Sequence, residues 1–154
     1  MPPPVRLQEI ADALEWQPED SSSFLNRDTG QVAVVSDDLL QAAEESSDPG
    51  WTLQAWQQPE WELAQQIVTT DCFEPLPTRF EVHEWAIMRD FAYSLLSGQR
   101  REDLLASLHG AGAFRHFKSS VRRQGLEPAW LAFRTAAFQQ IARDWCEEHQ
   151  IAWQ

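Results

Sequence analysis

Three cationic side chains in the last third of the chain are spaced to bind a charged ligand together. Arg115, Lys118 and Arg122 recur at intervals of three and four residues, which places them on one stripe of a helix. Arg123 lies at the edge of that stripe. Such a stripe is typical of side chains that contact the phosphates of a nucleic acid. We therefore predict a basic helix over residues 113–124, with Arg115, Lys118, Arg122 and Arg123 as the candidate binding residues.

The overall charge of the chain opposes nucleic-acid binding. The 154 residues include 12 Lys and Arg against 24 Asp and Glu, for a formal charge of -12. Residues 1–75 hold fifteen acidic residues and only Arg6 and Arg27, whereas residues 76–154 hold nine acidic and ten basic residues. Phosphate binding requires the cations to lie beyond the screening length, about 8 Å at physiological salt, from those acids. Pairing with the acidic half, or plain solvation, is the alternative that we favour for the basic helix.

An enzyme acting on a phosphorylated substrate is a third alternative. The segment Gly110-Ala111-Gly112 leads into the basic helix, whose first amide groups, with Arg115 and His116, would face an anion. The segment lacks the Lys-Ser/Thr ending of a phosphate-binding loop. Asp71-Cys72 and His83-Glu84 are adjacent pairs, which do not share a helix face. We lean against an enzyme and expect no catalytic residue, cofactor or metal site.

Tryptophans suggest a different class of function. The chain contains eight, and we expect most of them in the core. Where Trp51, Trp56 or Trp153 is exposed, its ring offers a partner protein a large contact surface. The acidic N-terminal half would in turn attract a basic partner. Protein–protein interaction or regulation is therefore the leading expectation, ahead of nucleic-acid binding.

The cysteines and the absence of long apolar runs indicate the compartment. Cys72 and Cys146 are too few and too far apart for a disulfide framework or a metal site, so we expect buried free thiols. No segment approaches the roughly 20 apolar residues of a membrane span, and the first residues lack the apolar core of a signal peptide. We expect a cytoplasmic protein without membrane contact.

The N-terminal half predicts two helices and a hairpin. Apolar spacing predicts a helix over residues 7–14, and Pro18 ends it near Trp16. Asp28-Thr29-Gly30 is a turn signal between two β-prone runs, which predicts a hairpin at about 23–35. Capping oxygens at residues 36–38 then predict a helix through Ala43.

The rest of the chain predicts helices over residues 60–69, 81–96 and 101–108, the basic helix, and a last helix that begins near Pro128. Pro75 and Pro77 hold the connection before residue 81 extended. Apolar residues at helical spacing predict the buried sides of these helices: Trp61, Ala64, Ile67 and Val68; Val82, Trp85, Met88, Phe91, Ala92 and Leu95; Phe114, Phe117 and Val121; and Trp130, Phe133, Ala137, Phe138, Ile141 and Trp145.

These elements predict an α+β protein that is mainly α-helical. We expect a helical bundle-like single domain over 1–154, with one N-terminal β-hairpin at 23–35 and a helical part over 60–153. Strands and helices do not alternate, so a parallel sheet is not expected.

Several segments together resemble a known family. Gly112-Ala113-Phe114-Arg115-His116-Phe117-Lys118 is followed by Gly125-Leu126, Trp130, Phe133 and Trp145, and preceded by Phe73-Glu74-Pro75-Leu76-Pro77 and by Phe24-Leu25-Asn26 with Thr29-Gly30-Gln31-Val32. In these segments the chain resembles uncharacterised protein family 0158, a group of small bacterial proteins. The resemblance implies a bacterial protein. That family has no established activity, so the resemblance implies no functional residue.

Overall fold

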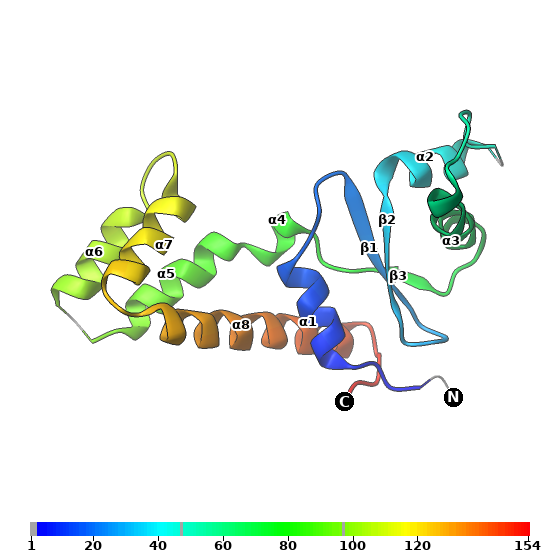
Figure 1. The fold of residues 1–154 in the computed structure, drawn as a ribbon. Helices are drawn as coiled ribbons and strands as arrows, with labels where there is room; N and C mark the ends of the chain where they lie inside the picture. The colour runs from blue at the N-terminus through cyan, green and yellow to red at the C-terminus, as the bar shows by residue number, and fades with distance from the viewer. Residues whose placement is uncertain (1–2, 47, 97) are drawn as a thin grey trace. The chain divides into compact units, whose positions relative to one another are not determined.

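The computed structural model describes residues 3–46, 48–96 and 98–154. The chain divides into two compact units, whose elements are labelled in Figure 1. Unit 1 comprises Met1–Thr78 and Ala142–Gln154, and unit 2 comprises Arg79–Ile141. The predicted fold class is confirmed, because the protein is mainly α-helical with one small antiparallel sheet. The expectation of a single domain stays a prediction.

A three-stranded sheet lies in unit 1, in the order β2-β1-β3 (Figure 1). The predicted hairpin is confirmed as β1, Ser21–Asn26, paired with β2, Val32–Ser36. β3, Phe73–Pro75, pairs antiparallel with the other edge of β1. The sequence predicted only an extended connection here, because the pairing of three residues with a strand about 50 positions away leaves no local pattern. Pro75 is tolerated because β3 is an edge strand.

Helices of unit 1 pack on this sheet and on each other. α1, Leu7–Glu15, and α2, Asp37–Glu45, match the predicted helices, and α3, Gln58–Thr69, follows a short 3₁₀ turn, η1, Ala55–Gln57. Ser36 caps α2 as expected, because its hydroxyl accepts a hydrogen bond from the Leu39 amide. Val35, Leu39, Trp61 and Ala64 form the apolar cluster that joins β2, α2 and α3.

The two ends of the chain close unit 1. The amide of Val5 donates to the Ala152 carbonyl, and the amide of Gln154 donates to the Val5 carbonyl, both at 2.9 Å. Val5 and Trp153 thereby form a parallel β-bridge. Because these residues lie nearly 150 positions apart, unit 1 is complete only when the whole chain has folded back.

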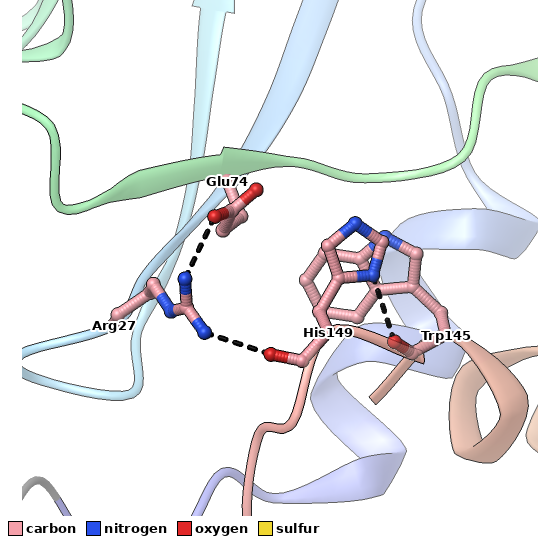
Figure 2. A network of polar contacts seen from close by, with 4 residues as sticks. All are labelled: Arg27, Glu74, Trp145 and His149. Carbon is pink, nitrogen blue, oxygen red and sulfur yellow. Dashed lines mark hydrogen bonds and ion pairs between the residues drawn. The ribbon is translucent and has the colours of Figure 1, made fainter. Parts of the chain in front are cut away.

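Arg27 adds a side-chain link between the sheet and the C-terminal segment. Figure 2 shows its guanidinium between Glu74 Oε1 of β3, 2.8 Å away, and the His149 carbonyl oxygen, 2.7 Å away. The His149 ring lies 4.7 Å from the Trp145 ring, measured between centroids, and its Nδ1 lies 2.9 Å from the Trp145 carbonyl oxygen. His149 directly follows the last residue of the last helix, Glu148.

The named elements of unit 2 are all helices. These are α4, Arg79–Val82; α5, Glu84–Ser94; α6, Gln99–Ser107; α7, Ala113–Arg123; and the first part of α8, Glu127–Glu148, which continues into unit 1. Edge-on aromatic contacts hold the unit together. The Phe91 ring lies 5.4–6.3 Å from the rings of Phe117, Trp130 and Phe133. These contacts confirm Phe91 on α5, Phe117 on α7 and Trp130 on α8 as core residues.

The predicted continuous helix over residues 81–96 is wrong. His83 adopts a left-handed conformation, with φ 54° and ψ 59°, and separates α4 from α5. Met88, Phe91 and Ala92 of α5 are buried as predicted, and Ile87 is buried beside them. Trp85, expected to be buried, is 40% exposed and donates its indole N–H to the Leu108 carbonyl at 3.1 Å.

Substitutions at His83 distinguish a broken helix from a continuous one. Because L-residues with a Cβ are strained at positive φ, we expect His83→Gly to be more stable than His83→Ala by about 1 kcal/mol. A continuous helix would reverse the order by a similar amount. Urea unfolding of both variants, followed by far-UV circular dichroism, measures the difference, and greater stability of the Ala variant would contradict the observed break.

Removing the Arg27 guanidinium should weaken unit 1. We expect Arg27→Met to lower the free energy of unfolding by about 1–2 kcal/mol, since it loses a carboxylate partner and a carbonyl partner at a partly exposed site. Arg6→Met is the matched control, because among the described residues Arg6 has no side-chain partner. Equal unfolding midpoints for the two variants would show that the Arg27 link does not stabilise the protein.

Candidate functional site

The predicted basic helix is confirmed as α7, Ala113–Arg123. Phe117 and Val121 are fully buried, and Phe117 lies edge-on to Trp130 with ring centroids 5.0 Å apart. Ser120 is buried beside them and accepts a hydrogen bond from the Gln124 side chain. These contacts fix the rotation of α7, so its opposite side faces solvent.

Phe114 does not belong to the buried side, contrary to the prediction. It is 46% exposed, whereas Phe117 and Val121 are fully buried. Steps of about 100° per residue place Phe114 between Val121 and Lys118 around the helix. It therefore borders the apolar face and contributes its ring to the cationic face.

The cationic stripe, defined as Arg115, Lys118 and Arg122, lines one open hollow together with Phe114 and Ser119. All three cationic residues are exposed. Arg122 Nε lies 3.4 Å from Glu127 Oε2, but both side chains are at least half exposed, so this pair contributes little stability. Within the part of the chain that the structure describes, Arg115 and Lys118 have no hydrogen-bond or ion-pair partner in their side chains. The stripe is thus available to an anionic ligand.

Arg123 is separated from the stripe. It lines a second hollow, between α6 and α7, with Asp103, His116 and Ser119. Three of the four predicted binding residues are therefore brought together, and the fourth lies around the helix beside a carboxylate.

Gly112 shapes the start of α7. Its φ is 76°, and a Cβ placed there would lie 3.5 Å from a guanidinium nitrogen of Arg115 and 3.5 Å from the His116 ring. Both side chains therefore lie close to the N-terminus of the helix, where backbone amides point outward. Positive or polar groups beside helix amides favour the approach of an anion.

Charge is divided between the two units. Unit 2 holds nine Lys and Arg against six Asp and Glu, a formal charge of +3, and unit 1 holds three against eighteen, or -15. The sequence had already indicated an acidic N-terminal half. The acidic C-terminal end of α8 belongs to unit 1, so unit 2 has a net positive charge.

Tryptophan exposure differs from the expectation of a mostly buried set. Five of the eight are among the exposed large hydrophobic residues: Trp16, Trp51, Trp56, Trp85 and Trp153. Only Trp61, Trp130 and Trp145 are buried. The exposed five include Trp51, Trp56 and Trp153, which we considered in the sequence analysis as contact surfaces for a partner.

The two cysteines differ in their surroundings. Both thiols are free, as expected. Cys146 is buried, and burial, with the neighbouring Glu147 carboxylate, raises the pKa of its thiol to about 11. Cys72 was also expected to be buried, but it is half-buried and immediately precedes β3. Its Sγ lies 3.5 Å from Thr70 Oγ1.

Among residues 3–46, 48–96 and 98–154, no group of three or more His, Cys, Asp or Glu side chains is arranged to hold a metal ion. Within the same residues, no helix combines the length and apolar character needed to cross a membrane.

Sequence reasoning missed a hollow beside α2. Asp38, Gln41, Ala42 and Glu45 line it from the helix, and Pro49 and Trp51 line it from the following loop. The helical spacing of the first four was a usable signal. No local pattern indicated that the Trp51 ring lies beside them.

Comparisons with known proteins identify no relative: no protein-family model, curated protein or solved structure matches the chain.

The cysteines should differ in reactivity. In the native protein at pH 8, we expect iodoacetamide to modify Cys72 well before Cys146, because a thiol with a pKa of about 11 is only about one-thousandth ionised at that pH. Peptide mass spectrometry over time measures the two rates, with protein in 6 M guanidinium as the control in which both react alike. Equal rates in the native protein would contradict the burial of Cys146.

Proposed function

We propose that this protein is a cytoplasmic binding protein rather than an enzyme, and that it contacts nucleic acid through the cationic stripe of α7. The observation that carries the proposal is the exposure of Arg115, Lys118 and Arg122 in a unit of charge +3, with two of the three unpaired among the described residues. Cations that have no internal partner are free to neutralise phosphates, and the release of counterions from the nucleic acid then drives binding.

Phe114 supports a nucleic acid over a small phosphate ligand. Its half-exposed ring lines the same hollow as the stripe. An aromatic ring beside cations suits contact with a base and its phosphates, as in proteins that bind single strands. Arg123, which lines the second hollow between α6 and α7, would contact a phosphate outside the stripe.

The remaining expectations form part of this proposal. Two free thiols suit a reducing compartment, which supports a cytoplasmic location. Membership of uncharacterised protein family 0158 is proposed on the segment from Gly112 to Lys118 and the residues quoted with it, and it would make the protein bacterial.

Protein–protein interaction is a second candidate function, and a separate observation favours it. Unit 1, of charge -15, exposes Trp16, Trp51, Trp56 and Trp153. Each exposed indole leaves apolar area in contact with water that a partner would cover. Acidic surroundings favour a basic partner.

Removing two unpaired cations should weaken nucleic-acid binding. We expect Arg115→Ala/Lys118→Ala to bind a labelled 20-base-pair DNA duplex or 20-nucleotide RNA at least tenfold more weakly than the unmodified protein. The slope of log Kobs against log salt should fall by up to about 2, since as many as two phosphate contacts are lost. Fluorescence anisotropy at several salt concentrations measures both quantities.

Arg6→Ala/Arg89→Ala is the matched control, because it removes the same charge from exposed positions outside α7. Equal loss in both double variants would assign the binding to net charge, and undiminished binding by the α7 variant would eliminate the stripe as the site. Circular dichroism of each variant establishes that it is folded.

A further inference from the structure

One face of α2 is turned away from the core and borders a hollow. Asp38, Gln41, Ala42 and Glu45 occupy positions i, i+3, i+4 and i+7, so they share a helix face. Leu39 lies on the other side of α2, packed with Trp61 and Ala64. Ala42 lies at the border and packs partly against the same core. Because that core fixes the rotation of α2, Asp38, Gln41 and Glu45 remain exposed.

The loop after α2 supplies an aromatic wall. Pro49 and Trp51 line the hollow, and Trp51 is 45% exposed. Among the described residues of this loop, the Asp48 amide donates to Ser46 Oγ and the Gly50 amide donates to Asp48 Oδ1. The hollow presents an indole ring beside a helix face.

The charged groups of the hollow are both carboxylates. Asp38 has no side-chain partner among the residues that the structure describes, and Glu45 accepts a hydrogen bond from the neutral Gln41 amide at 3.0 Å. No Lys or Arg is among its lining residues. Phosphates would be repelled here, whereas a cation would gain both the carboxylates and the electron-rich face of the indole.

We propose that this Trp51 hollow binds a basic segment of a partner protein, with one Arg or Lys side chain against the Trp51 ring and its charge directed to Asp38 and Glu45. The inference rests on the second candidate function, protein binding, and names its site and the chemistry of its partner. Charge complementarity selects the occupant, because the hollow is acidic within a unit of charge -15. Trp51 adds an apolar contact that a free metal cation would not use.

The test uses the full chain and a fluorescein-labelled 12-residue peptide of alternating Arg and Ala. At 150 mM salt we expect Trp51→Ala and Asp38→Asn/Glu45→Gln each to weaken binding at least fivefold. Trp51→Phe should retain most of the affinity, since the ring is conserved. The same peptide with citrulline in place of Arg should bind at least tenfold more weakly, because citrulline keeps the shape and removes the charge.

Two controls separate the hollow from the general acidity of unit 1. Trp56→Ala removes an indole that is 72% exposed but does not line the hollow, and Asp28→Asn/Asp71→Asn removes two exposed carboxylates elsewhere. If these controls weaken binding as much as the hollow variants, or if Trp51→Ala binds normally, the inference is overturned.

A pull-down from bacterial lysate distinguishes failure of the inference from failure of the candidate function. If the unmodified chain and Trp51→Ala capture a protein at the same stoichiometry, the hollow is not the binding site, although protein binding remains the function. Absence of any captured protein, together with normal peptide binding by Trp51→Ala, would overturn both. Loss of the captured protein in Trp51→Ala but not in Trp56→Ala, with the peptide results above, is the expected outcome.

Discussion

The return of the chain's C-terminal segment to its N-terminal segment is the constraint on which unit 1 depends. Unit 2 is inserted between Thr78 and Ala142, so unit 1 must be assembled from two separate stretches. The Val5–Trp153 bridge joins those stretches. The hydrogen bond from Arg27 to the His149 carbonyl joins them too (Figure 2). Loss of these links would release the C-terminal end of α8 from the sheet, and with it the packing of buried Trp145 and Cys146.

The insertion also sorts the charges. With α8 divided at Ile141, its acidic last turn joins unit 1, and the stripe on α7 belongs to a unit of charge +3. The two units therefore offer surfaces of opposite chemistry: cations beside Phe114 in one, and carboxylates beside Trp51 in the other. The net charge of -12 is the sum over both units, so it describes neither surface.

Both surfaces arise in the same physical way. In each case a helix buries one face, Phe117 and Val121 on α7 or Leu39 on α2, and the opposite face is left with charged side chains. An aromatic ring then lies at the border of that face. Rotation fixed by the core, rather than any hydrogen bond among the charged groups, holds these side chains at the surface.

Local patterns in the sequence were sufficient for most elements, since helical spacing, the Ser36 cap and the turn around Gly30 act over a few residues. They determined the hairpin, the basic helix and the spacing that puts Arg115, Lys118 and Arg122 on one stripe. Tertiary structure decided what local spacing does not encode: the pairing of β3, the left-handed break at His83, and the exposure of Trp85 and Phe114. It also decided that Trp51 lies beside α2. The physical reason is that burial and strand pairing depend on residues distant in the chain, whereas helix periodicity and capping depend only on neighbours.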